Sequence, residues 1–189
     1  MRFRPRRARQ RLHRAVARQG LTGVLLVGGA SRRFGSPKAL ARLDSETLAD
    51  RAWRTLGEAC DERLAVGKAS DRLELPFALV DDETDVRAPI AGVVAGLRAA
   101  KHDVCVFVPV DCPFVSPKSL RKLAERAPAH PQTGPLPGAY PRSLLSELER
   151  KLERGDYSLR ELEASVVGLD ERELANVNTQ TDLLRVQML

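Results

Sequence analysis

Residues 22–38 read TGVLLVGGASRRFGSPK and join a short apolar run to a loop rich in glycine and basic side chains. The run at residues 22–27 includes β-branched residues and has the length of a buried strand. Gly28 and Gly29 follow it directly, and glycine pairs favour a loop. We therefore expect a buried strand whose carboxyl end opens into a loop.

Strand patterns and helix patterns alternate after this loop. The run VCVFVPV at residues 104–110 is almost wholly apolar, which is typical of a central parallel strand covered on both faces. Further strands are expected at residues 63–66 and 77–80, and helices at residues 47–59, 89–100 and 117–127. The alternation predicts an α/β fold, with a single mainly parallel twisted sheet and helices on both faces.

The C-terminal third is less regular. Residues 128–141, PAHPQTGPLPGAYP, are rich in Pro and Gly, and we expect at most a very short strand there, near residues 136–140. Apolar spacing then predicts a helix at residues 142–152, a strand at 165–169 and a last helix at 182–187.

The net charge of +6 is concentrated at one end of the chain. Residues 1–20 contain eight arginines and no acidic residue, whereas the remaining 23 basic residues face 25 acidic ones. We expect a flexible basic extension at residues 1–20 and one folded domain at residues 21–189. A near-neutral domain does not indicate nucleic-acid binding.

Other features of composition exclude several classes of protein. The chain has no apolar run of the roughly 20 residues that a membrane span needs. No apolar stretch follows the basic segment, so the segment is not a secretory signal. The three cysteines form neither a disulfide framework nor a metal-ligand pattern. These observations predict a cytoplasmic protein.

The glycine-rich loop has the chemistry of a phosphate site. Glycines let backbone N–H groups approach a nucleotide, and Arg33 and Lys38 add fixed positive charge for a polyphosphate. The loop lacks the Gly-Lys-Ser/Thr ending of a P-loop and the glycine spacing of a dinucleotide fingerprint. It therefore predicts a nucleotide site of a different type.

A carboxylate follows the second buried strand. Asp111 comes directly after residues 104–110, within the sequence Pro109-Val110-Asp111-Cys112-Pro113. Mg²⁺ prefers carboxylate and phosphate oxygens, which a strand-end Asp and a triphosphate supply together. Cys112 adjoins Asp111, but no His lies near it in the sequence, and we interpret it as a packing residue.

Residues 26–38 resemble the signature Leu-Ala-Gly-Gly-x-Ser-x-Arg-x-Gly-x-x-Lys of the molybdenum cofactor guanylyltransferases, a family with a Rossmann-like nucleotidyltransferase fold. Val27 stands where Ala is usual. The resemblance implies that the loop surrounds a nucleoside triphosphate through Leu26, Val27, Gly28, Gly29, Arg33 and Lys38. The match around Asp111 to the element Cys/Pro-x-Asp-x-Pro implies that this residue binds the nucleotide and Mg²⁺.

Two further elements resemble the same family. Asp81 followed by Ala88-Pro89-Ile90-Ala91-Gly92 is similar to a strand-end Asp followed by Gly-Pro-Leu-x-Gly, and implies that Asp81 contacts the nucleotide and that Gly92 permits close approach. We expect the neighbouring residues 82–83 to form a solvated acidic turn. The sequence Asn176-Val177-Asn178-Thr179 is similar to Asn-x-Asn-Thr, which implies that Asn176, Asn178 and Thr179 face a pterin acceptor.

The resemblance implies transfer of GMP from GTP to a molybdopterin-type cofactor, with release of pyrophosphate. The acceptor phosphate is already an anion, so catalysis would rest on positioning and charge neutralisation by Arg33, Lys38 and Asp111. A molybdoenzyme or a chaperone would be the partner that receives the product.

Two alternatives stay open from the sequence. The chain could use CTP or another acceptor, because residues 128–141 are shorter than the corresponding family segment, although Gly28-Gly29 favours guanine. It could also be a non-catalytic nucleotide-binding adaptor with a basic tail. Retention of Lys38, Asp81 and Asp111 together argues against the adaptor.

Overall fold

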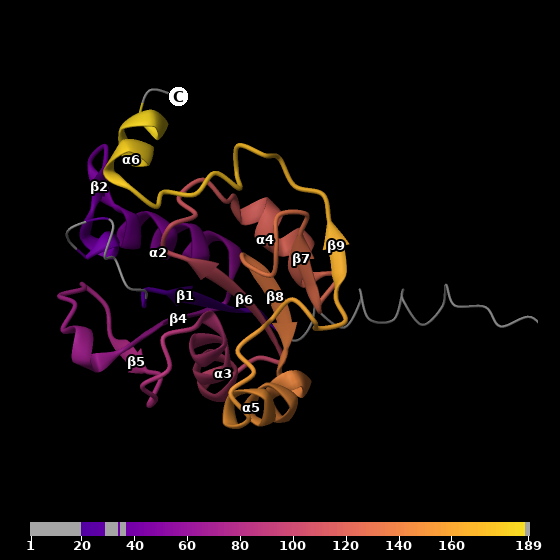
Figure 1. The fold of residues 1–189 in the computed structure, drawn as a ribbon. Helices are drawn as coiled ribbons and strands as arrows, with labels where there is room; N and C mark the ends of the chain where they lie inside the picture. Colours follow the sequence, from indigo (N-terminus) through magenta and orange to yellow (C-terminus); the bar gives the residue numbers. More distant parts are fainter. Residues whose placement is uncertain (1–19, 29–33, 35–36, 188–189) are drawn as a thin grey trace, which may run out of the picture.

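The computed structural model describes residues 20–28, 34 and 37–187, and the structural statements below concern these residues. They form a seven-stranded sheet with the order β5-β4-β1-β6-β8-β7-β9 (Figure 1). The strands are β1 (Thr22–Leu26), β4 (Glu62–Gly67), β5 (Leu79–Asp81), β6 (Val104–Pro109), β7 (Ala129–Pro131), β8 (Gly138–Pro141) and β9 (Ser165–Val167). The predicted basic extension lies outside the described residues except for Gly20.

The first half of the sheet is parallel. β1 lies between β4 and β6 and pairs with both in parallel. β5 pairs in parallel with the other edge of β4. Leu26 at the end of β1 is opposite Val66 on one side and Pro109 on the other. The carboxyl ends of three neighbouring strands therefore meet at one edge. The predicted α/β class with a mainly parallel sheet is confirmed.

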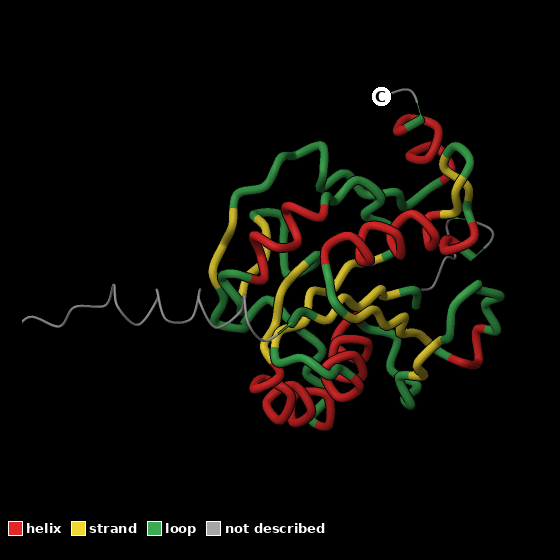
Figure 2. Tube along the Cα trace, turned by 180° about the vertical axis from the view of Figure 1, so that it is seen from behind, coloured by secondary structure: helices red, strands yellow, loops and turns green. Residues whose placement is uncertain are grey.

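Helices cover both faces of the sheet (Figures 1 and 2). On one face, α2 (Leu48–Ala59) and α4 (Pro117–Ala124) pack into a core with Leu25, Val106 and Val108. On the other face, α3 (Pro89–Ala99) and α5 (Leu145–Glu153) pack around Val24 and Phe107. Alternate residues of β1 and β6 thus enter opposite cores, as the period of a strand requires.

The helices begin where the sequence provides caps. Thr47 and Ser116 accept hydrogen bonds from the backbone N–H groups at the third positions of α2 and α4. Proline opens α3 and α4, where its missing N–H has no partner to lose. The last helix, α6 (Gln180–Val186), begins with a capping box between Thr179 and Asp182.

The prediction for residues 128–141 was wrong in one respect. The segment contains two strands, β7 and β8, rather than at most one. β8 pairs antiparallel with β6 from Val104 opposite Pro141 to Phe107 opposite Gly138, and it places the buried Tyr140 against Phe107. The strands are short and rich in Pro and Gly, so their pairing with β6 and β9, rather than local pattern, determines them.

A small hairpin was also missed. β2 (Arg42–Leu43) and β3 (Glu46–Thr47) pair antiparallel across a two-residue turn in which Asp44 has a φ of 58°. Two-residue strands carry no periodicity for a sequence pattern to detect. No helix in the described part of the chain is long and apolar enough to cross a membrane.

Phe107 offers a test of this core. Its side chain is fully buried, its ring centroid lies 6.0 Å from that of Tyr140, and a Cβ added at Gly96 would lie 2.7 Å from its Cε1 atom. Phe107→Ala should lower the free energy of unfolding by about 3–5 kcal/mol, because it leaves a cavity between sheet and helix. Val166 on β9 is 61% exposed, and Val166→Ala should change it by less than about 0.5 kcal/mol. Denaturant titration measures both, and equal effects would contradict the assigned core.

Candidate functional site

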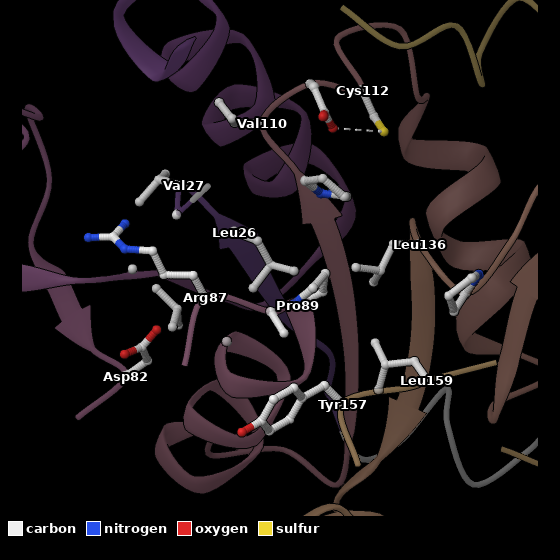
Figure 3. Close-up of a pocket in the computed structure, with 18 of the residues that line it drawn as sticks. Leu26, Val27, Asp82, Arg87, Pro89, Val110, Cys112, Leu136, Tyr157 and Leu159 are labelled. Atoms are coloured by element: carbon white, nitrogen blue, oxygen red, sulfur yellow. Dashed lines mark hydrogen bonds between the residues drawn. The ribbon is translucent and has the colours of Figure 1, made fainter. Parts of the chain in front are cut away.

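A pocket of about 570 Å³ opens at the carboxyl ends of β1, β4 and β6. This is the edge at which open parallel sheets bind ligands. Its walls come from loops far apart in the sequence (Figure 3). The lining includes Leu26, Val27, Gly28, Lys38, Gly67, Lys68, Asp82, Arg87, Gly92, Asp111, Leu136, Tyr157, Arg160 and Asn176.

Three of the predicted site residues meet here: Lys38 and Asp111 line the pocket, and Asn178 contacts Lys38 beside it. Lys38, in the short helix η1 (Lys38–Leu40), donates from Nζ to Asp111 Oδ2 at 3.1 Å and to Asn178 Oδ1 at 2.9 Å. The side chains of Lys38 and Asp111 are 15% and 26% exposed. A cation and a carboxylate thus lie in contact at a place that solvent still reaches.

The backbone explains why these residues meet. Val110 N donates to Leu26 O at 3.1 Å, which fixes the end of β6 beside the end of β1. Val177 N donates to Asp111 O at 2.9 Å, and the Val177 side chain is fully buried. The C-terminal segment is therefore anchored at Val177, with Asn176 and Asn178 on either side of it. Both asparagines are exposed, and only the first is among the pocket-lining residues.

Asn176 has a buried partner. Cys112, which is 3% exposed, lies with Sγ 3.0 Å from Asn176 Oδ1. The thiol donates this hydrogen bond, so the amide oxygen of Asn176 faces the protein. Thr179 has a different position from the two asparagines. Its Oγ1 accepts from Asp182 N at 3.1 Å as the cap of α6.

Small residues bring the chain close together beneath the pocket. A Cβ added at Gly92 would lie 2.8 Å from Leu26 Cδ2, so the first turn of α3 packs directly against the end of β1. A Cβ added at Gly28 would lie 3.7 Å from Gly67 Cα, which is ordinary contact. The close approach that Gly92 permits in this structure is to Leu26. Gly29 and Arg33, two of the predicted nucleotide-loop residues, lie outside the described residues.

The two neighbouring acids at the end of β5, Asp81 and Asp82, have opposite surroundings. Asp81 is exposed, and its Oδ1 accepts from Ala69 N and Glu83 N at 3.2 and 3.4 Å. Asp82 lines the pocket and is ion-paired with Lys68, each side chain being 8% exposed. The expectation that Asp82 belongs to a solvated turn was therefore wrong. Glu83, at 77% exposed, is solvated as expected.

Sequence reasoning missed one wall of the pocket. Residues 157–160 line it together with Thr133, Pro135 and Leu136. Lys151 of α5 anchors this loop through ion pairs with Asp156 and Glu161. The hydrogen bond between Lys151 and Asp156 raises the pKa of the lysine and lowers the pKa of the aspartate. The sequence signal was weak, since only Tyr157, one of two tyrosines in the chain, marks the loop.

The described residues contain no group of three or more His, Cys, Asp or Glu that could hold a metal ion. A cation bound here would need oxygens from a ligand in addition to the Asp111 carboxylate. Mg²⁺ binds in this way in many nucleotide sites, through one or two carboxylates and the substrate phosphates. The arrangement suits a polyphosphate ligand accompanied by a divalent cation.

Comparison with known proteins gives a consistent family. Residues 23–170 match the MobA-like NTP transferase domain. The chain is 32% identical to a probable molybdenum cofactor guanylyltransferase of Chloroflexus aggregans, with 88% of this chain and 93% of the relative covered. It is 33% identical to a probable molybdenum cofactor guanylyltransferase of Rhodopirellula baltica, with 86% and 90% covered.

Solved structures agree. Molybdopterin-guanine dinucleotide biosynthesis protein A from Archaeoglobus fulgidus superposes with a TM-score of 0.71 at 26% identity, covering 88% of this chain and 97% of that one. The 2-C-methyl-D-erythritol 4-phosphate cytidylyltransferase from Thermus thermophilus superposes with a TM-score of 0.66 at 18% identity, covering 88% and 97%. The second likeness shows the fold alone.

The cysteines give a test of the buried geometry around the site. Burial raises the pKa of Cys60 and of Cys105 to about 12, and burial together with the Asp111 charge raises the pKa of Cys112. A raised thiol pKa leaves little reactive thiolate at pH 8, so alkylation of the folded protein should be more than about 100-fold slower than that of the unfolded protein. Mass spectrometry after timed iodoacetamide treatment measures this for each cysteine. Rapid labelling of Cys112 in the folded protein would contradict its burial beside Asp111.

Proposed function

The chain belongs to the MobA-like NTP transferase family and is a nucleotidyltransferase, and from that premise we propose that it transfers GMP from GTP to a molybdopterin-type molybdenum cofactor. Pyrophosphate and the guanine dinucleotide form of the cofactor are the products. The relatives named as molybdenum cofactor guanylyltransferases support this substrate pair. The observation that carries the proposal is the contact of Lys38 with Asp111 in the pocket and with Asn178 beside it.

The reaction needs charge neutralisation more than proton transfer. An oxygen of the acceptor phosphate attacks the α-phosphorus of GTP, a new P–O bond forms, and the bond to the β-phosphate breaks as pyrophosphate leaves with the electron pair. The attacking oxygen is already anionic, so no general base is required. Lys38 contributes by binding phosphate oxygens and offsetting the charge that gathers on pyrophosphate. Arg33, outside the described residues, stays a predicted second cation.

Asp111 is the residue that would hold Mg²⁺. Its carboxylate lies at the end of β6, is partly exposed, and already faces a cation, Lys38. The chemistry supplied by bound Mg²⁺ is neutralisation of charge on the phosphate oxygens. Lys38 exchanges its contact with Asp111 for contacts with phosphate when the nucleotide binds. This exchange keeps each charged group paired in both states.

The asparagines suit the acceptor side. Asn178 accepts from Lys38, and Asn176 keeps its amide N–H groups away from Cys112 and available to a ligand. Amide groups both donate and accept hydrogen bonds, as a pterin edge requires. Asp81 and Gly92 are proposed on the nucleotide side. The role of Thr179 in acceptor binding is indirect on this proposal, because its hydroxyl caps α6 and so fixes the turn after Asn178.

The cellular setting follows from the proposed activity. All three cysteines are free thiols, which fits a reducing compartment, and we place the enzyme in the cytoplasm. The product would pass to a molybdoenzyme or to a chaperone that delivers it. CTP and other acceptors are the competing substrates of the same fold.

Nucleotide binding is the first test of the proposal. With Mg²⁺ present, GTP at about 100 times its Kd should stabilise the protein by about 2.7 kcal/mol and raise Tm by roughly 5–10 °C. CTP, ATP and UTP at the same concentration should give smaller shifts. Differential scanning fluorimetry measures all four. A preference for CTP would contradict the guanylyl assignment, and no shift with any triphosphate would contradict nucleotide binding itself.

The metal assignment has its own variant. Asp111→Asn should lower the Mg²⁺-dependent turnover of GTP by at least about 100-fold, since a neutral amide binds a cation weakly and does not pair with Lys38. Asp103, which precedes the opposite end of the same strand β6, provides the matched control. Asp103→Asn should retain turnover. Pyrophosphate release measures both, and normal Mg²⁺-dependent turnover in Asp111→Asn would rule out its assigned role.

A further inference from the structure

The pocket contains a second ion pair, which is more deeply buried than the first. Lys68 follows β4 and Asp82 follows β5, and Nζ of the lysine donates to Oδ1 and Oδ2 of the aspartate at 2.8 and 3.1 Å. Both side chains are 8% exposed, and both residues line the pocket. Nothing in the proposed chemistry of phosphate transfer uses this pair.

Stability does not explain the pair. Removing two charges from water costs several kcal/mol per ion, and their mutual attraction often does no more than offset that cost. A pair of apolar side chains would fill the same wall without this cost. The position of the pair in a ligand pocket therefore indicates a role in recognition.

The hydrogen bonds of Lys68 and Asp82 show which of the two residues can still bind a ligand. Lys68 Nζ donates to both oxygens of Asp82 and to Thr84 O, which accounts for its three protons. Asp82 Oδ1 also accepts from Thr84 N at 3.3 Å, whereas Oδ2 accepts only from Lys68 among the described residues. A carboxylate has about four acceptor sites, so Asp82 retains capacity to accept from a ligand.

The pair lies at the end of the pocket that suits a nucleobase. Figure 3 shows Asp82 and Arg87 on one side of Leu26, and Leu136 and Leu159 on the other. Small or apolar residues that line the same pocket fit a flat heterocycle: Leu26, Gly28, Val66, Gly67, Ala88, Pro89 and Gly92. With phosphates at Lys38, the base extends toward Asp82.

Resting on the proposed function, we propose that Asp82 is the residue that selects guanine, and that Lys68 is the positioning residue that fixes its carboxylate. Guanine presents two adjacent donors, N1–H and the N2 amino group, and the N2 amino group can donate to the acceptor site that Asp82 Oδ2 retains. Adenine N1 and cytosine N3 are acceptors and would face the carboxylate with like partial charge. Uracil has one N–H between two carbonyls. The pair therefore admits guanine and repels the other three bases.

The experiment exchanges donors and acceptors on both sides of the contact. ITP lacks the N2 amino group of GTP, and XTP carries a carbonyl in its place. Asp82→Asn keeps the size of the side chain and replaces one acceptor oxygen by a donor amide. Binding of GTP, ITP and XTP in the presence of Mg²⁺ is measured by calorimetry for the wild type, for Asp82→Asn and for Asp85→Asn. Asp85 is an exposed acid of the same loop and is the matched control.

The wild type and Asp85→Asn should bind GTP at least roughly tenfold more tightly than ITP, and should bind XTP more weakly still. Asp82→Asn should reverse the order and prefer XTP to GTP, because its amide donates to the xanthine carbonyl. A folded Asp82→Asn with the wild-type order of affinities would overturn the inference.

The wild-type comparison can overturn the inference even where Asp82→Asn does not fold. Equal affinity of the wild type for GTP and ITP overturns the role of Asp82 but leaves the proposed function standing, since GTP still binds. Wild-type binding of CTP in preference to GTP overturns both. The two failures are thus distinguished by the nucleotide that binds.

Discussion

The parallel pairing of β1 with β4 and β6 is the constraint on which the rest of the structure depends. It brings Leu26, Val66 and Pro109 side by side, so the loops that follow three strands open at one edge of the sheet. Lys38 and Asp111 then meet although 73 positions separate them in the sequence. The hydrogen bond from Val177 to Asp111 brings the C-terminal asparagines to the same place.

Three cations that line the pocket, Lys38, Lys68 and Arg87, are paired within the protein. Lys38 contacts Asp111, Lys68 contacts Asp82, and Arg87 contacts Asp71 at 2.8 Å. The side chains of the Lys38–Asp111 pair are more exposed than those of the Lys68–Asp82 pair, and the two pairs are therefore suited to different roles. Breaking a buried pair leaves an uncompensated charge, whereas solvent and a charged ligand compensate a partly exposed one. The first pair is therefore suited to exchange partners with a polyphosphate, and the second to present a fixed carboxylate.

The sequence predicted the parallel half of the fold and much of the site, for a physical reason. Residues 22–27 and 104–110 are apolar runs that end in a glycine pair and an aspartate, so both strands and both loops could be recognised locally. β7 and β8 were not predicted as a pair, because partner strands rather than local pattern hold them. Asp81 and Asp82 look alike in sequence, and only the path of the chain after β5 shows which one Lys68 meets. The loop at residues 157–160, which Lys151 anchors, was not predicted because its contacts depend on how α5 packs. The predicted roles of Gly29 and Arg33 concern residues outside the described part.

The central claim is that the pocket joins the α-phosphate of GTP to a phosphorylated pterin acceptor. Its most direct measurement follows label from GTP carrying radioactive phosphorus at the α or the γ position, with Mg²⁺ and with or without molybdopterin. We predict that α label enters the cofactor product only when the acceptor is present, while γ label is released as pyrophosphate. Release of α label as free nucleotide regardless of acceptor, with γ label released as orthophosphate, would contradict it.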